Sequence, residues 1–144
     1  MILQDNEFSC GAVALANCLE TVGADYSATA LAKMCRTSPT HGTDEKDVIK
    51  ALVKLEHPCR ELAESHPGFA LVTLRGFVAQ GAAAMLAVDA DTHWISVVGM
   101  CGTRFIVHDP AQGVTSYSDH ELVARWRKSK AKLAFYGIVM LGRK

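Results

Sequence analysis

The sequence predicts an α+β fold in which helices come first and an antiparallel sheet follows. Up to Pro58, apolar residues recur every three or four positions, which is typical of helices. From Ala84 onward, short runs with β character are separated by glycine-containing turns. This order favours separate helical and sheet layers. We expect one domain over residues 1–144, a length that allows a sizeable core, and we find no repeat or linker.

Three helices are predicted in the first part of the chain. The first begins at Cys10 and shows an apolar face until Gly23, which stands where a C-terminal cap belongs. The second follows Ser27, a residue type that caps helix N-termini, and runs through Ala28, Leu31, Ala32 and Cys35. The third opens at Thr43 with acidic residues in its first turn, and Pro58 ends it.

The remaining elements are one helix, a set of strands and a further helix. We predict a short helix over Thr73–Gln80 and a capping box of Ser118 with Glu121 that starts another helix. The predicted strands are residues 84–88, 93–100, 103–108, 114–117 and 133–141. A tight connection with Gly102 indicates that the second and third of these strands form a hairpin.

Composition and charge exclude several classes of protein. Fifteen basic and fifteen acidic residues cancel, so no bulk field attracts nucleic acid or a membrane. No apolar run reaches the ~18 residues of a membrane span. Five cysteines without a C-x-x-C pair argue against a disulfide framework and a structural zinc site. With no signal peptide visible, we expect a reducing cytoplasm, and export by a signal-independent route stays open.

The stretch from Gln4 to Leu19 has the features of a thiol nucleophile at a helix start. A helix N-terminus lowers the pKa of a thiol at the position of Cys10. Gly11 has no Cβ, which we expect to leave room for a substrate carbonyl. The amide of Gln4, six positions before Cys10, can donate to an oxyanion. Alone, this stretch is equally consistent with a buried cysteine in an ordinary amphipathic helix.

His93 and Asp109 supply candidate partners for the thiol. His93 opens one strand of the predicted hairpin and Asp109 follows the other, so both lie at the same end of the sheet. A histidine there can reach a thiol on a packed helix, and the carboxylate can fix its tautomer. Taken singly, His93 is also consistent with a strand-edge residue, and Asp109 before Pro110 with a turn. Their order after Gln4 and Cys10 favours the catalytic interpretation.

Other polar side chains receive simpler interpretations. Cys18, eight residues after Cys10, is more consistent with core packing than with a redox pair. The remaining histidines do not show metal-ligand spacing, so we expect no metal and no cofactor. We interpret the basic run as a solvated helix end, with an anionic partner as the alternative. The run consists of Arg125, Arg127, Lys128, Lys130 and Lys132.

The ordered set resembles the bacteriocin-processing cysteine peptidases, papain-like domains that trim double-glycine leader peptides and usually precede an export transporter. The residues that carry the resemblance are Gln4, Cys10-Gly11 with Ala14-Leu15, His93-Trp94 followed by Ile95, Val97 and Val98, and Asp109-Pro110-Ala111 with Gly113. The resemblance implies a papain-like fold and peptide-bond cleavage. It implies Cys10 as nucleophile and His93 as base and acid. Asp109 would orient His93, and Gln4 would donate to the oxyanion.

The resemblance also implies a peptide or protein substrate cut after small residues such as Gly-Gly. Trp94 is the bulky residue expected beside a narrow cleft, with core packing as its alternative role. No transporter follows in this chain, so we expect any export transporter to be a separate chain. The triad does not separate hydrolysis from acyl transfer. A papain-like transferase, amidase or effector toxin therefore stays open, whereas filled catalytic positions disfavour a non-catalytic peptide-binding module.

Overall fold

The computed structural model describes residues 9–39, 42–127 and 133–142. Its helices are α1 (Cys10–Thr21), α2 (Ala28–Met34), α3 (Glu45–Lys54), α4 (Pro67–Ala79) and α5 (Asp119–Arg125). Its strands are β1 (Cys59–Glu64), β2 (Ala83–Val88), β3 (His93–Cys101), β4 (Arg104–Asp109), β5 (Gly113–Tyr117) and β6 (Phe135–Met140). The strands form one antiparallel sheet in the order β1-β6-β2-β3-β4-β5. In the described part of the chain, every helix is too short or too polar to cross a membrane.

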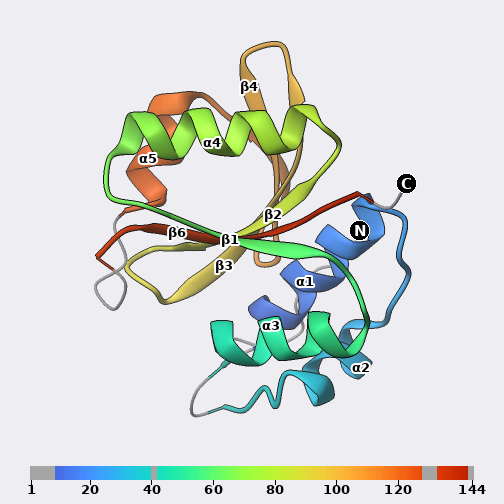
Figure 1. Cartoon of the computed structure of the whole chain (residues 1–144). Helices are drawn as coiled ribbons and strands as arrows, with labels where there is room; N and C mark the ends of the chain where they lie inside the picture. Colours follow the sequence, from blue (N-terminus) through green and yellow to red (C-terminus); the bar gives the residue numbers. More distant parts are fainter. Residues whose placement is uncertain (1–8, 40–41, 128–132, 143–144) are drawn as a thin grey trace.

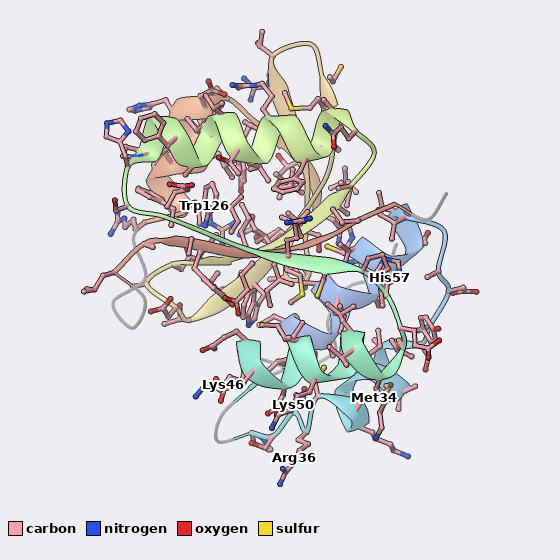
Figure 2. The ribbon with its side chains drawn as sticks, viewed as in Figure 1. Met34, Arg36, Lys46, Lys50, His57 and Trp126 are labelled. Atoms are coloured by element: carbon pink, nitrogen blue, oxygen red, sulfur yellow. The ribbon has the colours of Figure 1, made fainter. Side chains whose placement is uncertain are left out.

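The sheet lies between two layers of helices (Figure 1). Helices α1, α2 and α3 cover one face, where Leu15 and Leu52 belong to one apolar core. Helices α4 and α5 cover the other face, where Leu74 and Trp126 belong to a second core. Figure 2 shows the Trp126 side chain between α4 and the sheet. The predicted α+β class, with the first helices packed on an antiparallel sheet, is confirmed.

Helix α1 is the most deeply enclosed of the described helices. All its residues from Cys10 to Leu19 are buried, and all of them except Asn17 are apolar or small. Ala14 and Ala16 of α1 belong to the apolar core that this helix shares with the sheet, α2 and α3. Two polar contacts tie α1 to the sheet: Ser96 donates to the Ala14 carbonyl at 2.8 Å, and Asn17 Nδ2 lies 2.5 Å from His108 Nδ1. These contacts hold α1 against strands β3 and β4.

The two predicted serine caps are present, and the start of one predicted helix is shifted. The Ser27 side chain accepts from the backbone N–H of Ala30, and Ser118 forms the predicted capping box with Glu121. Helix α3 begins at Glu45 instead of Thr43, because the backbone of Asp44 is extended. The Thr43 carbonyl meanwhile accepts a hydrogen bond from the Trp94 indole at 3.1 Å.

The middle of the chain departs from the sequence prediction. The helix predicted over Thr73–Gln80 begins at Pro67, a favoured residue at a first helical position, and His66 caps it. Residues Cys59–Glu64 form edge strand β1 beside β6, an element that is absent from the sequence prediction. Its charged residues hide the strand pattern, and charged side chains are common on edge strands because they prevent further pairing.

Candidate active site

Cys10, His93 and Asp109 meet at one end of the sheet. Cys10 is the first residue of α1, His93 the first of β3 and Asp109 the last of β4. Strands β3 and β4 pair antiparallel as the predicted hairpin, so the start of one lies beside the end of the other. The imidazole Nε2 of His93 lies 2.8 Å from Asp109 Oδ1. The Cys10 thiol hydrogen-bonds to the same ring.

His93 therefore lies between a thiol and a carboxylate. Since Nε2 faces Asp109, Nδ1 is the ring nitrogen left for Cys10. Asp109 is itself held in place, because its Oδ1 also accepts from the backbone N–H of Ala111 at 2.9 Å. A nucleophile within reach of a base, and a base oriented by a third group, is the arrangement that acyl transfer through a thiol requires.

The electrostatics of the site favour a thiolate beside an imidazolium. Burial acts to raise the pKa of Cys10, but hydrogen bonds from His93 and the Trp94 backbone, together with the imidazolium charge, lower it overall. Burial acts to lower the pKa of His93, but its hydrogen bonds with Asp109 and Cys10 raise it to about 9. Burial acts to raise the pKa of Asp109, but His93 and Arg125 hold it well below its usual range. Both shifts act in the direction that places the shared proton on His93.

Arg125 belongs to this network, although its sequence context indicates a solvated residue. Its Nη1 donates to Asp109 Oδ2 at 2.7 Å and to the Tyr117 hydroxyl at 3.1 Å. Its Nε and Nη2 donate to the two carboxylate oxygens of Asp89 at 3.2 and 2.5 Å. The interpretation of Arg125 as part of a solvated helix end is therefore wrong. The available signal was its place three residues after buried Leu122, on the side of α5 that faces the sheet.

Of the rest of that basic run, Arg127 is exposed, and its guanidinium donates to the Ala124 carbonyl at 3.1 Å. Lys128, Lys130 and Lys132 lie outside the described residues, as does Gln4. In the ranges 9–39, 42–127 and 133–142, no group of three or more His, Cys, Asp or Glu residues could hold a metal ion.

Gly11 serves a packing role that the sequence analysis did not foresee. A Cβ on Gly11 would lie 2.3 Å from the Cβ and 2.6 Å from the Oγ1 of Thr43. The expectation that this space admits a substrate carbonyl is wrong, because the Thr43 side chain fills it. Thr43 is held in turn by Thr37, whose Oγ1 lies 2.7 Å from its own, and by the Trp94 indole. The segment before α3 thus packs against the start of α1, next to Cys10.

The other described cysteines differ from Cys10 in their surroundings. Cys18 and Cys35 are buried, and burial raises the pKa of each thiol to about 12. Burial also raises the pKa of Cys59, which is half-buried. Cys101 is exposed on β3. The burial of Cys18 within the α1 core agrees with its interpretation as a packing residue.

We expect brief iodoacetamide treatment at pH 6 to label Cys10 ahead of the other cysteines. An ordinary thiol with a pKa of ~8.5 is less than about 1% ionised at that pH, whereas the lowered pKa of Cys10 leaves more of the reactive thiolate. Mass spectrometry of the digested protein measures the labelling of each cysteine. Cys101, which is exposed, is the control for access of the reagent to a thiol. Faster labelling of Cys18 or Cys35 would contradict the assignment.

The sequence profile described as the peptidase C39 family matches residues 1–133 of the chain. The fold is similar to that of the peptidase domain of Streptococcus ComA, a bi-functional ABC transporter involved in quorum sensing. That match has a TM-score of 0.75 and 20% identity, and it covers 99% of this chain and 97% of that one. No curated protein matches the sequence.

Two further solved structures share the fold. One is a double glycine motif protease from an AMS/PCAT transporter in complex with the leader peptide. It has a TM-score of 0.73 and 18% identity over 98% of this chain and 88% of that one. The other is a putative C39-like peptidase from Bacillus anthracis, with a TM-score of 0.71 and 13% identity over 100% of this chain and 94% of that one. At these identities the matches show the fold alone.

Proposed function

The chain belongs to the peptidase C39 family, and from that premise we propose that it is a cysteine peptidase acting through Cys10, His93 and Asp109. The family includes cysteine peptidases that cleave double-glycine leaders. The observation that carries the proposal is the position of His93, which hydrogen-bonds to a thiol on one side and to a buried carboxylate on the other. Of the four residues that the sequence singles out, Cys10, His93 and Asp109 interact in series, and Gln4 lies outside the described residues.

The reaction begins with the Cys10 thiolate, whose proton is held by His93. The thiolate attacks the carbonyl carbon of the scissile peptide bond, and negative charge moves to the carbonyl oxygen. The backbone N–H of Cys10, which has no acceptor inside α1 because the helix begins there, donates to this oxyanion. We assign the second donor to the Gln4 side-chain amide.

His93 completes the first half of the reaction by giving its proton to the leaving amine, which leaves a thioester on Cys10. Water then attacks the thioester, with His93 taking its proton, and the acid product and free thiol are released. Asp109 accepts from Nε2 throughout, which keeps Nδ1 directed at the thiol and stabilises the imidazolium. Each step uses groups of this chain together with water.

We propose a peptide or protein substrate that is cut after small residues such as Gly-Gly. One of the similar structures is described as a double glycine motif protease bound to a leader peptide, which supports this substrate class. Buried Trp94 packs in the same core as Cys10 and donates to the Thr43 carbonyl, and we propose that it forms a rigid wall of the substrate cleft. Forcing a larger side chain against such a wall typically costs ~1–3 kcal/mol.

An export transporter is the further partner that we propose. Two of the similar structures come from transporters, one described as a bi-functional ABC transporter. In such an arrangement the peptidase would trim the peptide that the transporter carries.

Fluorogenic peptides that end in Gly-Gly before the reporter should be cleaved, and Leu-Leu and Phe-Arg versions much more slowly. The steric penalty at the wall predicts a roughly 10- to 100-fold preference in kcat/KM. Cys10→Ala, assayed in parallel, should be inactive. Faster cleavage of the Phe-Arg peptide would refute the small-residue specificity and keep the peptidase assignment. If no peptide is cut while Cys10 still labels quickly at pH 6, a transferase, amidase or toxin activity replaces hydrolysis.

A further inference from the structure

Arg125 connects the Asp109 carboxylate to the turn that precedes His93. One nitrogen of its guanidinium, Nη1, donates to Asp109 at 2.7 Å, and its other two nitrogens donate to Asp89. Asp89 directly follows β2, and the turn ends where β3 begins at His93. The backbone contributes as well, because the N–H of Asp89 donates to the Arg125 carbonyl at 3.1 Å. One residue of α5 therefore touches both segments that place the imidazole and its carboxylate.

The turn held by Arg125 has an unusual backbone. Asp89, Ala90 and Asp91 all have positive φ, at 53°, 57° and 69°, although none of them is glycine. Left-handed conformations of this kind persist only where surrounding contacts enforce them. The Arg125 contacts and the Thr92 hydroxyl, which donates to the Asp89 carbonyl at 2.6 Å, supply that enforcement. A change at Arg125 thus affects the segment that sets the start of β3.

Asp109 gives Arg125 a second role. The Asp109 side chain is 1% exposed, so water does not satisfy its oxygens. Its Oδ1 is engaged by His93 and Ala111, and Oδ2 by Arg125. Without Arg125, Oδ2 would be a buried carboxylate oxygen that has lost its cationic partner, an expensive arrangement that the side chain would relieve by moving.

We propose that Arg125 is a positioning residue of the active site, which holds Asp109 and the start of β3 so that His93 meets both Cys10 and Asp109. The proposal rests on the proposed function, because it concerns the same site. The positioning role depends on the planar guanidinium of Arg125, whose nitrogens donate to several acceptors at once. A lysine ammonium is a compact charge on a flexible stem and does not reproduce this fork.

The groups that set the ionisation of the thiol come from several elements. His93 of β3 lies beside Cys10 of α1, and Asp109 of β4 lies behind His93. Behind Asp109 are Arg125 of α5, with Tyr117 of β5 and Asp89 of the turn on the same guanidinium. Loss of the guanidinium removes a positive charge and displaces the imidazolium. Both effects raise the pH at which the Cys10 thiolate forms.

The test compares Arg125→Gln and Arg125→Lys with Arg127→Gln, a matched change at the same helix end whose guanidinium contacts only the Ala124 carbonyl in the described structure. The readouts are kcat and KM on the Gly-Gly reporter and the rate of Cys10 alkylation between pH 4 and 9. Arg125→Gln should lower kcat on the order of 100-fold with KM within about twofold, the pattern of misplaced catalytic groups. The acid limb of the alkylation profile should move up by about one pH unit.

The kcat and the acid limb of Arg125→Lys should lie between those of wild type and Arg125→Gln. Arg127→Gln should match wild type in both readouts. Unchanged kcat and an unchanged acid limb in Arg125→Gln would overturn the proposal. If Arg125→Gln fails to fold by circular dichroism, Arg125→Lys decides, because wild-type kcat with an ammonium in place of the fork overturns it equally. The alkylation profile needs no peptide cleavage, so it tests Arg125 even where the reporter is not cut and the proposed peptidase activity fails.

Discussion

Replacing His93 with alanine is expected to lower kcat by on the order of 10⁵-fold or more on a peptide that the wild type cleaves. In triads that act as a unit, loss of the base costs nearly as much as loss of the nucleophile. Here His93 both holds the Cys10 proton and supplies it to the leaving amine, so its removal stops two steps. The Cys10 thiol would also lose the hydrogen bond and charge that lower its pKa. Steady-state kinetics and Cys10 alkylation at pH 6 measure the two effects.

His120→Ala provides the matched control for that change. His120 is exposed on α5, away from the contacts that join Cys10, His93 and Asp109. It should keep wild-type kcat and wild-type alkylation. If His93→Ala retains kcat within about tenfold of wild type while folded, His93 is not the general base, since general acid–base groups contribute at least about 100-fold.

Replacing Gln4 with alanine should lower kcat by about 100- to 1000-fold with KM nearly unchanged. An oxyanion donor acts where charge develops in the transition state, so its loss affects turnover more than substrate binding. Gln4 lies outside the described residues, so the prediction rests on the sequence motif and on the need for a donor beside the Cys10 backbone N–H. Initial-rate kinetics over a range of Gly-Gly reporter concentrations separates the two constants.

Asn6→Ala changes another amide in the same segment and serves as the control for Gln4→Ala. It should leave kcat close to the wild-type value. Cys10 alkylation at pH 6 should persist in Gln4→Ala, because the donor acts on the substrate oxygen and not on the thiol. An effect confined to KM would assign Gln4 to substrate binding and leave the oxyanion with a different second donor.

The sequence by itself determined the features that depend on neighbouring residues. The Ser27 cap and the Ser118–Glu121 capping box are local hydrogen bonds, so the residue types predict them. The hairpin of β3 and β4 likewise follows from a short connection between two β-rich runs. Because that hairpin places its two outer ends together, the sequence also predicted that His93 and Asp109 would be neighbours, as the 2.8 Å contact shows.

Only the tertiary structure decided the features that join distant segments. Thr43 occupies the space beside Gly11, and nothing in the residues around Gly11 indicates which segment packs there. Arg125 is 16 residues from Asp109 and 36 from Asp89. An arginine at the end of a short helix has the same local sequence whether it faces water or a buried carboxylate. The packing of α5 on the sheet decides between these two environments, because it brings the guanidinium within hydrogen-bonding distance of two carboxylates that are distant in the sequence.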